Sequence, residues 1–258
     1  MNGQSVPLQR ERWLLLGMLL ALATLAWGVV AWSARALPAM ASGPTMGMAA
    51  PLFLAIWVAM MVAMMFPSAA PMILMYVGIA RGRSQRGQAF APTWVFVGGY
   101  LVVWALAGLA AYLLATGSAW LLDRSPWLTA HAGQLAGALL IAAGVYQLTP
   151  LKGACLAKCR TPIQFLLGSW REGYAGALRM GLAHGLVCLG CCWLLFVILF
   201  PLGIMNIAAM ALLTALIFAE KALPHGELTS RVAGAALVLY GALVLLDPAL
   251  LPGAMAGM

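Results

Sequence analysis

The chain has 258 residues, of which 64% are hydrophobic and only 8% charged, and its net charge is +8. Soluble domains carry roughly 25% charged residues, so this composition excludes a water-soluble globular protein and favours one whose solvent is lipid. The basic residues lie between apolar stretches, so they indicate membrane topology and contact with anionic lipid head groups, and they do not indicate nucleic-acid binding.

Seven apolar stretches follow one another along the chain, and a helix needs roughly 20 such residues to cross a bilayer. They lie near residues 13–33, 50–80, 92–116, 130–149, 175–200, 203–220 and 231–247. The pattern predicts an all-α, polytopic transmembrane bundle of about seven helices, or six if the N-terminal one is not counted in the core. We expect one bundle over 13–247, a cytoplasmic N-terminus over 1–12, a cytosolic loop over 150–173 and a C-terminal tail over 248–258.

The basic residues also predict the orientation. If the N-terminus is cytoplasmic, all but two of the 14 Lys and Arg residues fall on the inner side, and only Arg35 and Arg124 lie outside. Cytoplasmic loops of membrane proteins carry an excess of Lys and Arg. The sequence therefore predicts a multi-pass protein of a bacterial cytoplasmic (inner) membrane. Within the fifth stretch, Gly181 and Gly185 are spaced to let another helix approach closely.

The fifth stretch also contains His184, Cys188, Cys191 and Cys192. At about 100° per residue these four fall within an arc of roughly 100°, so one wall of the helix presents an imidazole and three thiols. Soft thiolates select Cu(I), zinc or iron–sulfur clusters, and imidazole suits copper, zinc and iron. The pattern predicts a buried metal site, with Cu(I) favoured and zinc or iron as alternatives. The simpler alternative is that the cysteines pack as small hydrophobic residues.

The second stretch combines methionines with two prolines. If it is helical, an arc of roughly 140° contains Met60, Met61, Met64, Met65, Met72 and Met75, and Ser68 lies within it. Pro67 and Pro71 predict a kink in this helix. Because thioethers bind Cu(I) and largely ignore hard ions, we expect Met64, Met65 and Met72 to line an approach to the metal. The alternative is that these methionines fill irregular gaps between helices.

The predicted cytosolic loop contains Cys155 and Cys159, which share a face if the segment is helical. Their basic neighbours favour the thiolate form. We expect this pair to exchange metal at the cytosolic mouth or to exchange disulfides, and the alternative is two ordinary cysteines in a basic loop. The sequence does not decide whether this pair meets the cysteines of the fifth stretch.

Three further polar residues belong to the sixth stretch. Asn206 lies near its start and is a candidate site residue, while Glu220 and Lys221 end it. We interpret Lys221 as half of an interfacial Glu–Lys pair at a helix end. The role of Glu220 stays open, because a carboxylate near the membrane usually faces the bundle interior or a partner.

Four segments in this order resemble the DUF2182 family, whose members are described as predicted metal-binding integral membrane proteins. The segments are Ala63 to Met72, Lys152 to Pro162, His184 to Trp193 and Glu220 to Gly226. The resemblance covers roughly residues 50–245. It implies a bound metal, and it implies no established reaction.

The leading hypothesis is therefore an integral membrane protein that binds a soft metal, most favourably Cu(I), in a Cys/His/Met site for metal handling or transport. Its expected partners are membrane lipid, the metal ion, and a metal chaperone or a larger membrane complex. One alternative is a membrane thiol–disulfide or cofactor-bearing redox protein. Another is a structural or assembly subunit of a larger membrane complex.

Overall fold

The computed structural model describes residues 5–36, 45, 47–89 and 92–251, so parts of the predicted terminal segments (1–4 and 252–258) lie outside the described residues. Its long helices are α1 (Ser5–Ala36), α2 (Ala50–Ser84), α3 (Thr93–Arg124), α8 (Gly173–Val197) and α11 (Gly226–Leu246). The shorter ones are α4 (Pro126–Ala130), α5 (Ala132–Gln147), α6 (Pro150–Arg160), α7 (Pro162–Ser169), α9 (Leu199–Leu202) and α10 (Ile207–Ala222), followed by the 3-10 turn η2 (Pro248–Leu250). No strand occurs among the described residues, and the predicted all-α bundle is confirmed.

In the described part of the chain, five helices are long and apolar enough to cross a membrane, namely α1, α2, α3, α8 together with α9, and α11. The pair α5 and α6 passes the same test only as one span bent by 60° at the break between them. Among the described residues the candidate spans therefore number five, or six with this bent pair, where the sequence predicts about seven. The reason is length, since α5 and α10 have 16 residues each. At 1.5 Å per residue each reaches only about 24 Å, less than the roughly 30 Å of a hydrocarbon core.

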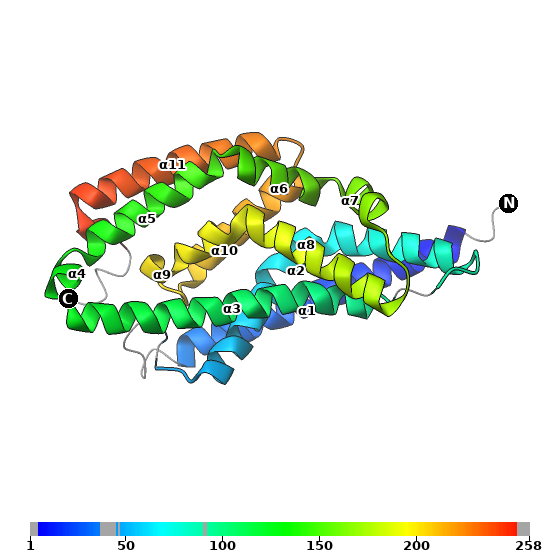
Figure 1. Ribbon diagram of the computed structural model, residues 1–258, viewed down its shortest axis with the longest axis horizontal. Helices are drawn as coiled ribbons and strands as arrows, with labels where there is room; N and C mark the ends of the chain where they lie inside the picture. Colours follow the sequence, from blue (N-terminus) through cyan, green and yellow to red (C-terminus); the bar gives the residue numbers. More distant parts are fainter. Residues whose placement is uncertain (1–4, 37–44, 46, 90–91, 252–258) are drawn as a thin grey trace.

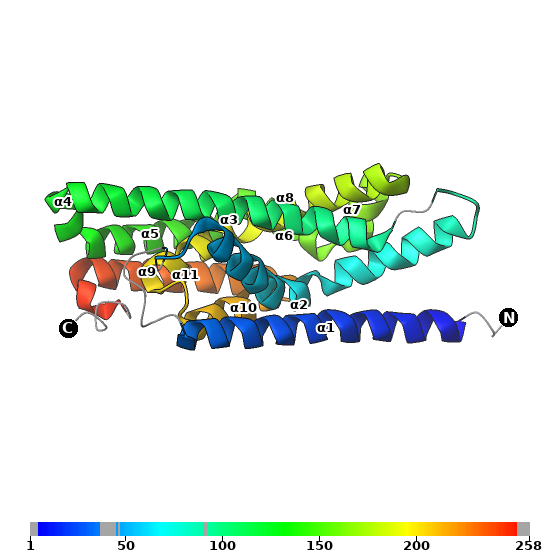
Figure 2. The same cartoon turned by 90° about the horizontal axis from the view of Figure 1, so that it is seen from below.

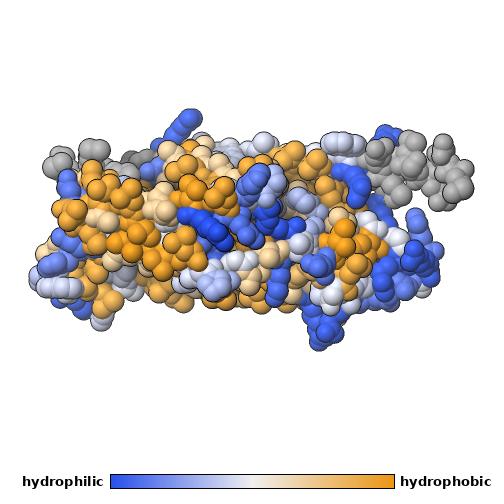
Figure 3. Space-filling view, turned by 90° about the horizontal axis from the view of Figure 1, so that it is seen from above, coloured by the Kyte–Doolittle hydropathy of each residue, from blue (hydrophilic) through white to orange (hydrophobic). Residues whose placement is uncertain are grey.

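The long helices run approximately along the long axis of the molecule, and the start of α1 lies at the opposite end from η2 (Figures 1 and 2). Helices α5 and α11 lie side by side, as do α3 and α8. One face is largely apolar toward the end that contains η2, and hydrophilic residues gather midway along it and toward the other end (Figure 3). Such an apolar surface suits contact with lipid tails.

Glycines hold both helix pairs close together. A Cβ atom on Gly181 of α8 would lie 2.1 Å from the carbonyl oxygen of Phe96 in α3, and one on Gly185 would lie 2.9 Å from Val103. In the second pair, a Cβ on Gly144 of α5 would lie 2.6 Å from the carbonyl oxygen of residue 234 in α11. Only glycine allows such backbone contact, so the close approach predicted from the small residues of α8 is present.

The predicted kink in the second helix is visible in Figure 2, where α2 changes direction partway along its length. Pro67 and Pro71 lie inside this helix. Proline has no N–H to donate to the preceding turn, and its ring clashes with the carbonyl four residues earlier. The bent helix contributes many of the buried side chains of the bundle, including Met64, Met65 and Met72.

Candidate metal centre

The predicted wall of α8 faces the interior of the bundle. His184, Cys188, Cys191 and Cys192 are each at most 3% exposed. The contact of Gly181 with α3 fixes the rotation of α8, and residues on the same side of the helix are buried with it. The four predicted donors therefore do not face lipid.

Helix α6 brings the other two cysteines to this wall. The hydroxyl of Thr149 accepts a hydrogen bond from the backbone N–H of Lys152 and so caps the start of α6, where Pro150 occupies the first turn. The thiol of Cys159 lies beside the thiols of Cys188 and Cys191 and interacts with both. The two cysteine groups of the sequence thus form one cluster.

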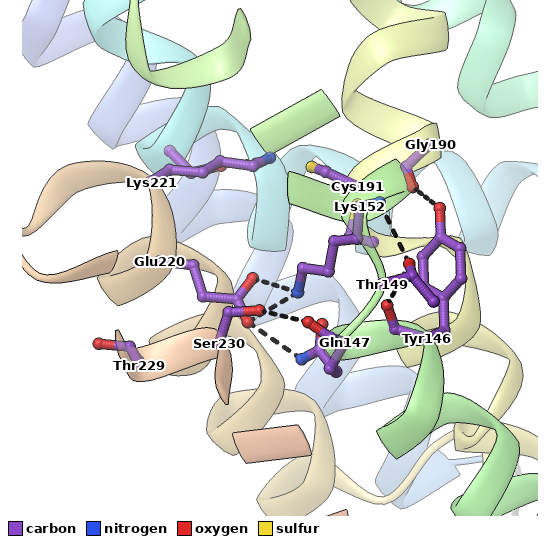
Figure 4. Close-up of polar contacts among 12 residues, drawn as sticks. Tyr146, Gln147, Thr149, Lys152, Gly190, Cys191, Glu220, Lys221, Thr229 and Ser230 are labelled. Carbon is purple, nitrogen blue, oxygen red and sulfur yellow. Dashed lines mark hydrogen bonds and ion pairs between the residues drawn. The ribbon is translucent and has the colours of Figure 1, made fainter. Parts of the chain in front are cut away.

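Cys155 lies at the edge of this cluster. A Cβ atom on Gly190 would lie 3.0 Å from the sulfur of Cys155, so glycine leaves the room that this thiol occupies beside α8. The hydroxyl of Tyr146, at the end of α5, donates to the carbonyl oxygen of Gly190. This bond helps to hold the corner between α5 and α6 against α8 (Figure 4). Cys155 and Cys159 are half-buried, in contrast to the fully buried cysteines of α8.

The positively charged side chain of Lys221 lies among the thiols. The Nζ atom of Lys221 is 3.1 Å from the sulfur of Cys188, and the hydroxyl of Tyr100 is 3.3 Å from the same sulfur. The thiols of Cys191 and Cys192 donate to the carbonyl oxygen of Cys188 at 3.1 and 2.9 Å. Figure 4 shows the amine of Lys221 and the sulfur of Cys191 directed toward one another. An ammonium group in this position favours the thiolate form of the cluster.

The interfacial Glu220–Lys221 pair that we predicted is replaced by two different contacts. Lys221 reaches the thiols, and the carboxylate of Glu220 instead accepts hydrogen bonds from Lys152 at 2.8 Å and from Gln147 at 3.0 Å. Successive residues on a helix point about 100° apart, so adjacent side chains at the end of α10 face different neighbours. Figure 4 shows the two side chains directed to different partners.

Sequence reasoning missed Lys152 and Tyr100. The charge pattern places Lys152 among the cytosolic charges, but it is fully buried and forms an ion pair with Glu220. The available signal was Glu220 itself, because a carboxylate within an apolar helix needs a cationic partner. Tyr100 carried no signal, since nothing local in α3 distinguishes it from a packed aromatic residue.

His184 is buried without a hydrogen-bond partner. Neither Nδ1 nor Nε2 has one, although both atoms are inaccessible to solvent. The ring stacks at 5.3 Å from the ring of Tyr100 and at 6.0 Å from that of Phe96. A buried polar nitrogen without a hydrogen-bond partner lowers the stability of the fold by roughly 1–3 kcal/mol, so a ligand that binds this imidazole would remove an unfavourable term.

The methionine face of α2 adjoins the cluster through Ser68. The hydroxyl of Ser68 lies 3.5 Å from Nζ of Lys221. Met64, one turn earlier, and Met72, one turn later, are buried on the same side of α2, and the neighbouring Met65 is buried as well. Of the two prolines of the predicted site, Pro67 is half-buried and Pro71 exposed, and both shape the helix.

Asn206 has a structural explanation that the sequence did not reveal. Its side-chain oxygen accepts from the N–H of Ala209 at 3.1 Å, and its side-chain nitrogen donates to the carbonyl of Leu202 at 3.1 Å. This is the geometry of a helix N-cap, and it accounts for the asparagine at the start of α10.

Within the described part of the chain, no group of three or more His, Cys, Asp and Glu side chains is arranged so that it could hold a metal ion. The thiols contact one another, Lys221 and the backbone. A pair of thiolates suffices to hold Cu(I), which is soft and accepts low coordination, whereas tetrahedral zinc needs four ligands.

Comparison with known proteins matches the chain to a family. The model of the PpoB2 family, described as a copper chaperone, matches residues 54–244. No curated protein and no solved structure matches the chain. The matched range includes all five cysteines and the three histidines. The predicted metal association is confirmed in the coarse form of a copper-associated family, and the resemblance to DUF2182 in particular stays a prediction.

Proposed function

Because the chain belongs to the PpoB2 family of copper chaperones, we propose that it binds Cu(I) inside a membrane helix bundle, at the thiols where α6 meets α8. Five helices of membrane-spanning length support the membrane setting. In this proposal the protein receives Cu(I) at one edge of the cluster, holds it between helices and passes it on.

The contact of Cys159 with Cys188 and Cys191 is the observation that carries the proposal. It joins a half-buried thiol on a short helix to fully buried thiols on a long one. Cu(I) moves between proteins by exchange of one thiolate for another, and a continuous row of thiols allows each step to keep the ion bound. Cys155 and Cys159 would accept the ion, and the cysteines of α8 would hold it.

His184 and Lys221 would complete the site. Cu(I) on two thiolates leaves a net negative charge, and a buried charge needs a partner. The ammonium of Lys221, 3.1 Å from Cys188, is that partner. His184 would supply a nitrogen donor that the protein leaves without a hydrogen bond. Met64, Met65 and Met72 would supply thioether sulfurs from α2.

The orientation that the basic residues predict belongs to this proposal. If the protein lies in a bacterial inner membrane with its N-terminus in the cytoplasm, α6 and α7 lie toward the inner side. Cys155 and Cys159 would then face the compartment where thiols stay reduced. A thiol-bearing metal chaperone of the cytosol is the partner that fits such an entrance.

Elemental analysis of the purified protein tests the proposal. We expect stoichiometric copper after purification under reducing, copper-replete conditions, and its loss in the Cys188→Ser/Cys191→Ser variant. The matched control is Cys155→Ser, which should keep the bound copper and slow its uptake from a copper–glutathione complex. Copper-free wild-type protein, or full copper in the double variant, would overturn the proposal.

The thiol contacts also favour a second candidate, a membrane thiol–disulfide relay. All five cysteines are free, and Cys159 lies where it could pair with Cys188 or Cys191. Thiol trapping in intact cells discriminates between the two functions. A reversible oxidised fraction that depends on Cys159 supports the relay, and fully reduced thiols at all times support copper binding.

A further inference from the structure

A small apolar cavity lies apart from the cysteine cluster, beside the first turns of α2. Its volume is about 10 Å³, and it is lined by Met48, Phe53, Ile56, Trp57, Met60, Ile204 and Met205. Three methionines from three segments meet here: one precedes α2, one lies within α2, and one lies in the turn between α9 and α10. The volume corresponds to about one water-sized sphere, which also accommodates a single metal ion.

The lining does not suit water. A buried water needs two to four polar partners, and the only lining side chain that can form a hydrogen bond is Trp57. Its indole N–H already donates to the carbonyl oxygen of Trp104 at 3.0 Å. Thioether sulfurs bind Cu(I), and the faces of aromatic rings attract cations. The lining is thus chemically suited to a soft monovalent cation.

One face of α2 connects the cavity to the cysteine cluster. Met60, Met64 and Ser68 follow at intervals of four residues, so they lie one above the other on the helix. Met60 lines the cavity, and Ser68 contacts Lys221, which contacts Cys188. The distance along the helix from Met60 to Ser68 is about 12 Å. A buried thioether at Met64 lies halfway along this path.

The cavity lies nearer to the end of the bundle that contains η2 than the entrance at α6 does. Helix α9 and the start of α2 lie toward that end, whereas α6 lies about midway along the molecule and α7 lies toward the start of α1 (Figures 1 and 2). With the N-terminus in the cytoplasm, the cavity belongs to the outer half of the membrane. This placement would put a second sulfur site farther toward the outer side than the half-buried cysteines.

We propose that Met48, Met60 and Met205 form a second, thioether-only site for Cu(I), to which the ion passes from the cysteine cluster along α2. This inference rests on the proposed copper function and extends it, because two sites at different depths make a path across the bundle. A thioether site releases Cu(I) more readily than a thiolate site because its ligands carry no charge. That property suits the exit end of the path.

A variant with all five cysteines replaced by serine separates the two sites. We expect this chain to bind one Ag(I), the redox-stable analogue of Cu(I), equally well at pH 5 and pH 7, because thioethers take up no proton in this range. Adding Met60→Leu and Met205→Leu should abolish this binding. The matched control is Met180→Leu, a buried methionine of α8 outside the cavity lining, which should leave it unchanged.

A second measurement covers the case in which the cysteine-free variant does not fold. In the wild-type chain labelled at the methionine methyl carbons, Ag(I) should shift the NMR signals of Met48, Met60 and Met205 and leave that of Met180 in place. Unshifted signals, or no Ag(I) bound by a folded cysteine-free chain, would identify the cavity as a packing gap. That result would leave the cysteine site standing, since the cysteine site is judged by its own copper analysis.

Discussion

The buried ion pair between Lys152 and Glu220 offers a sharp test of how α6 is held. The ammonium lies 2.8 Å from the carboxylate, and the two side chains are 0% and 1% exposed. Glu220→Gln keeps the shape of the side chain and leaves the ammonium buried without its countercharge. Breaking a buried pair in this way costs roughly 3–5 kcal/mol. Solvent cannot reduce this cost, because neither group reaches it.

The loss should appear in thermal unfolding of the detergent-solubilised protein. At about 2–4 °C per kcal/mol for a chain of this size, Glu220→Gln should lower Tm by roughly 6–20 °C. The double variant Lys152→Met/Glu220→Gln removes both charges and should recover most of the loss, because replacing a buried pair by uncharged residues is often nearly neutral. A dye that reacts with thiols should also label Cys155 and Cys159 faster in the single variant.

Three results would refute this role of the Lys152–Glu220 pair. If Glu220→Gln unfolds at the wild-type temperature, the carboxylate does not compensate the Lys152 charge. If the double variant is as unstable as the single one, the cost comes from lost packing and not from an unpaired charge. Unchanged labelling of the two cysteines, despite a lowered Tm, would show that the pair does not hold α6 against α8.

Three further substitutions test the packing, the charge and the cap. Gly181→Ala should destabilise the bundle by about 1–3 kcal/mol, because the new methyl group would meet the Phe96 carbonyl; Gly98→Ala, which meets nothing within 4 Å, is the matched control for thermal unfolding. Lys221→Met should weaken Cu(I) binding by roughly 10–100-fold, because the site loses a charged hydrogen bond, whereas Lys221→Arg should retain most of the affinity. A competition titration with a chromogenic chelator measures both. Asn206→Ala should cost about 1 kcal/mol through the lost cap and leave the copper content unchanged; a loss of copper would make this residue more than a cap.

The bent pair of α5 and α6 shows a limit of what the pattern of hydrophobic residues predicts. The apolar stretch near 130–149 was long enough in sequence to suggest a full span, but the helix ends at Gln147, and α6 turns away by 60°. The turn follows from Thr149 and Pro150, which start a new helix. A pattern of hydrophobic residues does not report the direction that a chain takes after such a start.

By itself, the sequence determined the lipid environment, the helical class and the His–Cys wall of α8, because composition and the 100° turn per residue are local properties. Only the tertiary structure decided that Cys159 meets this wall, that Lys152 pairs with Glu220 and that Lys221 turns to Cys188. Those contacts join segments that are far apart in the chain. They depend on the bend before α6 and on the glycine contacts that fix how α3 and α8 are rotated against each other.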